Sequence, residues 1–243
     1  MKAMIFAAGL GTRLRPLTDT MPKALVSVGG VPMLERVIRK LRGYGIDEFV
    51  VNVHHFAPMI EHFLESNRNF GASIAVSHEC DQALETGGGI KKAEPLLASG
   101  PFLVHNADIL TGFDLNYLFD RVRPDALATL LLRDADSDRY LLFDDDMRLC
   151  GWTNAITGEV KSPFRDLDIS RCHRYAFCGI HVISDTIFPL MADWPEKFGI
   201  IDFYLAVAAE HPIYGVVADD IRLVDIGSPD KLREAELMVQ GSM

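Results

Sequence analysis

The sequence predicts an α/β fold in which a Rossmann-like, mixed and mostly parallel sheet is flanked by helices and carries a small β-rich region. Through most of the 243 residues, strand-sized apolar segments alternate with segments whose apolar residues recur at helical spacing. This alternation implies parallel strands joined by right-handed crossovers. The middle of the chain, from about Asp134 to Arg174, is instead rich in turns and acidic residues. We expect it to form hairpins inserted over the sheet.

The first half supplies most of the expected parallel sheet. Pro32–Tyr44 illustrates a helix, because Pro32 suits a first turn and Leu34, Ile38 and Leu41 recur at helical spacing. Strands are expected over Lys2–Ala7, Phe49–Val53, Ser73–Ser77, Phe102–His105 and Ala126–Leu132, and helices over Pro32–Tyr44, Pro58–Leu64, Gly89–Leu97 and Leu115–Arg123.

Regular alternation resumes after the turn-rich middle. A strand is expected over Phe177–Ile183, a helix over Ile201–Glu210 and a strand over Ile221–Asp225. Ser228 should cap a last helix that has Pro229 at its first position. We expect one domain over residues 1–240, and 241–243 resembles an expression remnant.

Composition argues against several classes of protein. Hydrophobic residues make up 49% of the chain, too many for a disordered protein. The longest apolar runs, such as Ala126–Leu132, are strand-sized, so no membrane span is expected. The apolar start is followed by Arg13-Leu14-Arg15-Pro16 rather than a small-residue cleavage site, which argues against a signal peptide and for the cytoplasm. The net charge of −10 argues against nucleic acid as a partner.

The cysteines predict neither a disulfide framework nor a zinc site. They lack C-x-x-C spacing, so we expect reduced and mostly buried thiols. They are Cys80, Cys150, Cys172 and Cys178.

A glycine-rich segment, Ala7-Ala8-Gly9-Leu10-Gly11-Thr12-Arg13-Leu14-Arg15-Pro16, follows the first strand and precedes Pro22-Lys23. Such glycines let backbone N–H groups face phosphate oxygens. Leu14 replaces the third glycine of a dinucleotide motif, and no Gly-Lys-Ser/Thr of a Walker loop follows. Arg13 offers a fork of donors to a polyphosphate, and Lys23 a compact charge to one phosphoryl group. Arg15 is equally well explained by a structural ion pair.

A second glycine segment, Leu84-Glu85-Thr86-Gly87-Gly88-Gly89-Ile90, begins the third expected helix. The glycines have two interpretations. They can form a tight turn with no further role. Alternatively, they can admit a flat base and its ribose against the backbone.

Two aspartates each follow an apolar strand. Asp108 ends the segment that begins at Phe102, and Asp225 follows Leu223-Val224 and precedes Gly227. The carboxyl ends of strands are where open α/β folds bind ligands. Two carboxylates beside a triphosphate suit Mg²⁺, which prefers one or two carboxylates together with phosphate oxygens and water.

Together these segments resemble the signature of the sugar-phosphate nucleotidyltransferase superfamily, which includes mannose-1-phosphate guanylyltransferase-like enzymes. The resemblance implies a Mg²⁺-dependent enzyme that joins a nucleoside triphosphate to a sugar 1-phosphate and releases pyrophosphate. The Leu84–Ile90 segment is similar to that of the N-acetylmuramic acid 1-phosphate uridylyltransferases of bacterial cell-wall recycling, which implies UTP and N-acetylmuramic acid 1-phosphate as substrates. Mannose- or heptose-1-phosphate guanylyltransferases, glucose-1-phosphate thymidylyl- or uridylyltransferases and a non-catalytic nucleotide-sugar sensor stay open as alternatives.

The resemblance also implies residue roles. Arg13, Lys23, Asp108 and Asp225 would be catalytic, the two aspartates as Mg²⁺ ligands. Gly179 would let the sugar lie close to the backbone, although a buried strand with a spacing glycine explains it equally. Residues 1–133 would bind mainly the nucleotide and 134–227 mainly the sugar. The implied nucleotide-binding residues are Ala8, Gly9, Gly11, Thr12, Arg13, Lys23, Glu79, Thr86, Gly87, Gly88 and Asn106.

Overall fold

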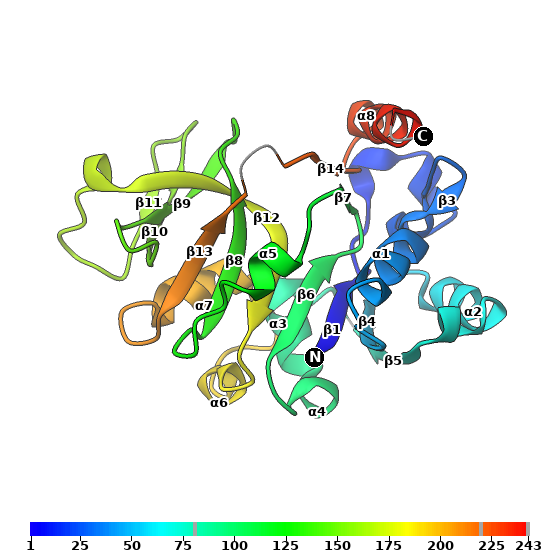
Figure 1. Ribbon diagram of the computed structural model, residues 1–243, viewed down its shortest axis with the longest axis horizontal. Helices are drawn as coiled ribbons and strands as arrows, with labels where there is room; N and C mark the ends of the chain where they lie inside the picture. The colour runs from blue at the N-terminus through cyan, green and yellow to red at the C-terminus, as the bar shows by residue number, and fades with distance from the viewer. Residues whose placement is uncertain (80–81, 219–220, 242–243) are drawn as a thin grey trace.

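A computed structural model shows a mixed sheet between two layers of helices (Figure 1). The structure describes residues 1–79, 82–218 and 221–241, so Cys80 and residues 242–243 of the expected remnant lie outside the described residues. The helices are α1 (Met33–Arg42), α2 (Ala57–Ser66), α3 (Glu85–Lys92), α4 (Glu94–Leu97), α5 (Asn116–Phe119), α6 (Ile187–Met191), α7 (Ile200–Val207) and α8 (Pro229–Gln240). The strands are β1 (Lys2–Phe6), β2 (Ser27–Val28), β3 (Val31–Pro32), β4 (Glu48–Val53), β5 (Ser73–His78), β6 (Phe102–Asn106), β7 (Ile109–Thr111), β8 (Ala128–Arg133), β9 (Arg139–Phe143), β10 (Leu149–Asn154), β11 (Val160–Lys161), β12 (His173–Ile183), β13 (Ile213–Val217) and β14 (Leu223–Asp225).

Within the described residues, ten strands form the main sheet in the order β11-β10-β9-β12-β6-β1-β4-β5, with β8 beside β12 and β13 beside β8. Strands β6, β1, β4 and β5 are parallel, as expected for the first half. Strand β12 runs antiparallel to β6, β8 and β9 and joins the two halves. The predicted fold class, a mixed and mostly parallel sheet flanked by helices, is confirmed.

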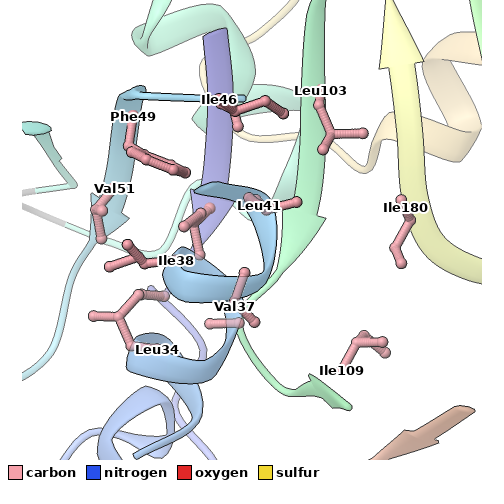
Figure 2. Close-up of a cluster of buried hydrophobic side chains, with 14 of the residues drawn as sticks. Leu34, Val37, Ile38, Leu41, Ile46, Phe49, Val51, Leu103, Ile109 and Ile180 are labelled. Atoms are coloured by element: carbon pink, nitrogen blue, oxygen red, sulfur yellow. The ribbon is translucent and has the colours of Figure 1, made fainter. Parts of the chain in front are cut away.

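Alternate residues of the strands bury two separate faces, which is why the strands read as nearly continuous apolar runs. One face packs against α1, α2 and α5. Figure 2 shows Ile38 of α1 beside Val51 of β4, in the same cluster as Leu34, Leu41 and Phe49. The other face packs against α3, α4, α6 and α7. No helix among the described residues is long and apolar enough to cross a membrane.

The turn-rich middle does not lie over the sheet as expected. Strands β9, β10 and β11 pair edge to edge and lengthen the sheet beyond β12. The eleven residues of β12 allow this, because its first part pairs with β9 and its last part with β6. The β-rich region therefore extends the sheet at one end, at the left of Figure 1.

Three local predictions were also wrong. The predicted helix over Gly89–Leu97 begins earlier, at Glu85, and is divided into α3 and α4. Helix α6 and strand β13 were not predicted. Strand β14 does not join the main sheet but pairs with β7 in a separate two-stranded ribbon.

A third apolar cluster anchors the glycine-rich loop. It joins Leu14 of the glycine-rich segment and Val26, which follows Lys23, to Ile226 beyond β14 and Ala235 of α8. In Figure 1 the β7–β14 ribbon and α8 lie side by side at the top of the view. The loop is thereby packed against the segment that carries Asp225.

Candidate active site

A cavity of about 430 Å³ opens where β1 and β6 end. It lies at the carboxyl edge of parallel strands, where the sequence placed the ligand site. Of the predicted site residues it brings together Ala8, Gly9, Gly11, Thr12, Arg13, Lys23, Glu79, Thr86, Asn106 and Asp108.

The glycine-rich loop depends on Gly11. Its φ is +63°, and a Cβ there would lie 2.8 Å from Thr18 Cγ2 and 3.1 Å from the Lys23 Cβ. The buried Thr18 hydroxyl donates to the Gly11 carbonyl at 2.8 Å. Only glycine combines this backbone conformation with such close packing. Thr18, which the sequence did not single out, therefore fixes the loop from behind.

Each predicted metal ligand is in contact with a lysine. The Lys23 ammonium contacts Asp108 Oδ2, and the Lys231 ammonium contacts Asp225 Oδ2. The two aspartates are held together because the Ile226 N–H donates to the Asp108 carbonyl at 3.0 Å and Asp225 stands opposite Ile109 in the β7–β14 ribbon. The ribbon thus brings the backbones of the two aspartates close together, and of the two residues only Asp108 lines the cavity.

Gly227 leaves room for Arg13 next to Asp225. A Cβ on Gly227 would lie 2.5 Å from Asp225 Oδ1 and 2.9 Å from Arg13 Nη2. The Gly227 N–H also donates to Asp225 Oδ1 at 3.1 Å. The Arg13 guanidinium and the Asp225 carboxylate therefore both lie close to Gly227, which lines the cavity.

The donor set fits Mg²⁺. Asp108 and Asp225 supply the carboxylate oxygens that this ion prefers, and each already faces a cation in the structure. Among the described residues no group of three or more His, Cys, Asp or Glu side chains could hold a metal. Two carboxylates leave the remaining positions to phosphate oxygens and water, as is usual for Mg²⁺.

Glu79 lines the cavity, but its carboxylate is occupied by the protein itself. Glu79 Oε1 accepts from Asn52 Nδ2 at 2.8 Å, and Oε2 accepts from the Leu84 N–H at 2.7 Å. This predicted nucleotide-binding carboxylate thus holds Leu84, the residue before α3. Asn52, which the sequence did not indicate, also lines the cavity, and its buried Oδ1 has no partner among the described residues.

Gly87 and Gly88 do not line the cavity, which corrects their predicted place against the base. A Cβ on Gly87 would lie 2.3 Å from the Phe198 ring, and one on Gly88 would lie 2.1 Å from the Glu196 carbonyl. Both N–H groups donate to the Phe198 carbonyl. The glycines instead allow the segment before α7 to pack onto α3.

Gly179 acts on the cavity through Asn106. It is buried, has a φ of +69°, and a Cβ there would lie 2.6 Å from Asn106 Nδ2. Asn106 lines the cavity, whereas Gly179 does not. The expectation that Gly179 exposes backbone to a sugar is therefore corrected: its missing side chain makes room for the Asn106 amide.

A second cavity, of about 530 Å³, lies between the β-rich region and α7. Its walls include the aromatic side chains of Tyr140, Trp152 and Phe177. Lys161 lies 5.2 Å from the centre of the Trp152 ring and pairs with Asp202 at 3.1 Å. Aromatic faces beside charged groups are typical of sites for polar, ring-shaped ligands.

The sequence profile of the family described as "Nucleotidyl transferase" matches residues 2–140 of this chain. The chain belongs to the nucleotidyl transferase family. The match covers the glycine-rich loop, Lys23 and Asp108. It confirms the family that the motifs indicated.

Curated relatives of this nucleotidyl transferase extend over its whole length. It is 32% identical to an N-acetylmuramate alpha-1-phosphate uridylyltransferase of Caulobacter vibrioides, over 96% of this chain and 95% of the relative. It is 30% identical to a D-glycero-alpha-D-manno-heptose 1-phosphate guanylyltransferase of Aneurinibacillus thermoaerophilus, over 99% of both chains. Both relatives are named as sugar-1-phosphate nucleotidyltransferases.

A solved structure shares the fold. The UTP-bound UGPase of Acinetobacter baumannii superposes with a TM-score of 0.79 at 18% identity, over the whole of this chain and 94% of the other. The extended mixed sheet of the nucleotidyl transferase is therefore a fold already seen in a solved protein.

Lys231 and Asn52 lie close to the predicted site residues but were not predicted from the sequence. Lys231 stands in the first turn of α8, directly after the Asp225 segment, and a basic residue at that place was the available signal. Asn52 lies next to the last residue of β4, which is parallel to β1, and Asn106 ends β6 on the other side of β1. The second cavity had no comparable signal, because its walls come from five separate elements, β9, β10, β11, β12 and α7.

Proposed function

We propose that this nucleotidyl transferase joins a nucleoside triphosphate to a sugar 1-phosphate, with UTP and N-acetylmuramic acid 1-phosphate as substrates, and releases pyrophosphate. The observation that carries the proposal is that Arg13, Lys23 and Asp108 line one cavity together with Gly227, and that Asp225 lies next to Gly227. The similarity to the Caulobacter uridylyltransferase over nearly the whole chain supports the choice of substrates.

The nucleophile is a phosphate oxygen of the sugar 1-phosphate. It is ionised at neutral pH, so the protein needs no general base, and the cavity contains no histidine among the residues that line it in the described chain. The chemical difficulty is to bring two polyanions together in line. The protein meets it by positioning and by charge.

Lys23 neutralises charge on the α-phosphate, and Arg13 stabilises the departing pyrophosphate. The glycine-rich loop presents backbone around the triphosphate, held by Gly11 and Thr18. Asp108 and Asp225 would hold Mg²⁺, which when bound supplies positive charge to the α-phosphate and the acceptor oxygens. Lys23 pairs with Asp108 and Lys231 with Asp225.

The base would lie near Asn52 and Thr86, which line the cavity. The free Oδ1 of Asn52 is suited to accept from a ring N–H of uracil. Glu79 supports this residue by accepting from its Nδ2.

The sugar fits the second cavity, so residues 1–133 would bind mainly the nucleotide and 134–227 mainly the sugar. Trp152 and Phe177 offer apolar faces to the pyranose ring, and Lys161 offers a cation. Arg139, at the same cavity, is suited to the lactyl carboxylate of N-acetylmuramic acid. As a consumer of UTP in cell-wall recycling, the enzyme would act in the cytoplasm.

A panel of substrates tests the assignment. The protein is incubated with Mg²⁺, one of UTP, GTP, CTP or dTTP, and the 1-phosphate of N-acetylmuramic acid, mannose, glucose or heptose, and pyrophosphate is measured. Release that depends on UTP and N-acetylmuramic acid 1-phosphate is expected. Release with another pair would keep the reaction and reject the substrates. Tight binding of a nucleotide sugar with no release from any pair would indicate a sensor.

A further inference from the structure

Glu85 adopts a backbone conformation that favours glycine. Its φ is +63°, although it is neither glycine nor asparagine. Such residues persist where the surrounding structure forces them, and they are concentrated at functional sites. A glycine at this position would take the same conformation without the steric cost.

The segments on either side of Glu85 hold it in place. The Leu84 carbonyl accepts from the Phe198 N–H at 3.2 Å, and the Thr86 hydroxyl accepts from the Ile200 N–H at 3.0 Å. The Gly87 N–H donates to the Phe198 carbonyl at 2.9 Å. The start of α3 is thus bonded to the start of α7 at points before and after Glu85, and neither set of bonds needs the Glu85 side chain.

The Glu85 carboxylate itself is free. Its side chain is exposed, lines the main cavity, and makes no hydrogen bond or ion pair within the described part of the chain. A glutamate kept at a glycine-favouring position with no structural partner calls for a ligand as the explanation.

Residues that line the two cavities come close together beside Gly199. A Cβ on Gly199 would lie 3.6 Å from Glu85 Oε2 and 3.4 Å from Asp202 Oδ2. Glu85 lines the main cavity and Asp202 lines the second one. Lys161 pairs with Asp202 through Oδ1, which leaves Oδ2 toward Glu85.

We propose that Glu85, with Asp202 beside it, is a specificity-determining residue that accepts hydrogen bonds from uncharged donors of the acceptor sugar, namely hydroxyl or amide N–H groups. Ionised carboxylates accept such bonds strongly. Two carboxylates with a single lysine leave excess negative charge at the junction, so an anionic substituent of the sugar has to lie elsewhere. This inference rests on the proposed function and adds the residue that recognises the sugar.

Two variants separate binding of the sugar from the backbone effect. Glu85→Gln keeps size and shape but removes the charge, and we expect the KM for the sugar 1-phosphate to rise about tenfold or more, with the KM for UTP within about twofold of wild type. Glu85→Gly should show the same rise in KM, together with a thermal midpoint equal to or above that of wild type. The matched control is Arg68→Gly, an exposed residue with a φ of +51° outside both cavities, for which unchanged kinetics are expected.

Acceptor analogues identify the source of the donors. Removing a hydroxyl or the N-acetyl group from N-acetylmuramic acid 1-phosphate should weaken its binding to wild type. For the analogue that lacks the group bound by Glu85, this loss of binding should be smaller in Glu85→Gln than in wild type. A rise in the KM for UTP alone would overturn the proposal, because Glu85 would then bind the ribose of UTP rather than the sugar. Unchanged kinetics, or a lower thermal midpoint for Glu85→Gly, would overturn it by showing that Glu85 has a structural role. Binding of the sugar 1-phosphate by calorimetry provides the same comparison if wild type releases no pyrophosphate, so failure of the proposed function is recognised separately.

Discussion

Lys23 and Asp108 form an ion pair inside the main cavity although 85 positions separate them in the chain. The lysine side chain is only 13% exposed, so this pair is well shielded from solvent. Lys231 and Asp225 form a similar pair nearby, with a more exposed lysine. Each carboxylate therefore faces a cation, and Lys23 also lines the main cavity.

Replacing Lys23 by methionine should separate catalysis from metal binding. We expect turnover to fall about 10²-fold or more, because a charge partner of the transition state is lost. Mn²⁺, used as a spectroscopic substitute for Mg²⁺, should bind at least as tightly as to wild type, because Asp108 no longer faces an ammonium. Turnover and Mn²⁺ titration measure the two effects, with Lys92→Met, an exposed lysine outside the cavity, as the control. Weakened Mn²⁺ binding would contradict this role of Lys23.

Arg13→Ala and Asp225→Asn should each reduce turnover by about 10²-fold or more while the fold is retained. Arg13 is exposed and Asp225 lies on a short ribbon, so neither change disturbs an apolar cluster. Steady-state rates and circular dichroism check the two halves of this expectation. An unchanged rate in either variant would remove that residue from the mechanism.

Gly227→Ala should damage the site without unfolding the protein. The new methyl group would have to displace Asp225 Oδ1 and the Arg13 guanidinium, both ends of side chains. A shift of about 1 Å in such groups costs about 10²-fold in rate, so we expect a loss of this order with little change in thermal midpoint. Gly112→Ala, whose added Cβ would meet nothing within 4 Å, is the matched control. Equal rates for Gly227→Ala and Gly112→Ala would show that the rate does not depend on the lack of a side chain at Gly227.

Much of the fold could be predicted because the first half of the sequence is locally consistent. The strand β1, the loop through Gly11 and the helix α1 follow from apolar spacing and glycine placement alone. Asp108 was recognisable as a strand-end carboxylate for the same reason. These features depend on neighbours in the sequence.

The errors depend on partners that are distant in the sequence. Gly87 and Gly88 are glycines because Phe198 and Glu196 pack against them, and Gly179 because Asn106 does. The place of β9–β11 at the sheet edge depends on the length of β12, whose register changes near Gly179. Periodicity carries no information about such pairings, so it cannot distinguish a glycine that faces a ligand from one that faces the protein.

Acid should destabilise the protein through its buried histidines. Burial lowers the pKa of His105 from 6.5 to about 4 and that of His181 to about 3. Between pH 6.5 and 4 the unfolded chain takes up these protons and the folded protein does not, so stability is present above pH 6.5 and is lost as the pH falls. Each histidine should contribute a slope of about 1.4 kcal/mol per pH unit.

His181→Phe tests this pH dependence. The Tyr204 hydroxyl loses its partner, His181 Nδ1 at 2.9 Å, so stability should be lower at neutral pH. The free energy of unfolding from urea titrations should nevertheless fall less steeply between pH 6 and 4.5, by about 1.4 kcal/mol per pH unit. Parallel pH profiles for the variant and wild type would contradict the assignment.

The most direct test of the proposed site follows the phosphorus atoms of one reaction. Wild type, Asp108→Asn and Asp225→Asn are each mixed with Mg²⁺, UTP and N-acetylmuramic acid 1-phosphate, and ³¹P resonance spectra are recorded over time. Wild type should form pyrophosphate and a nucleotide-sugar diphosphate in equal amounts, and both variants should do so at least about 10²-fold more slowly. Equal rates in all three proteins would contradict the claim that these two aspartates form the site of nucleotidyl transfer.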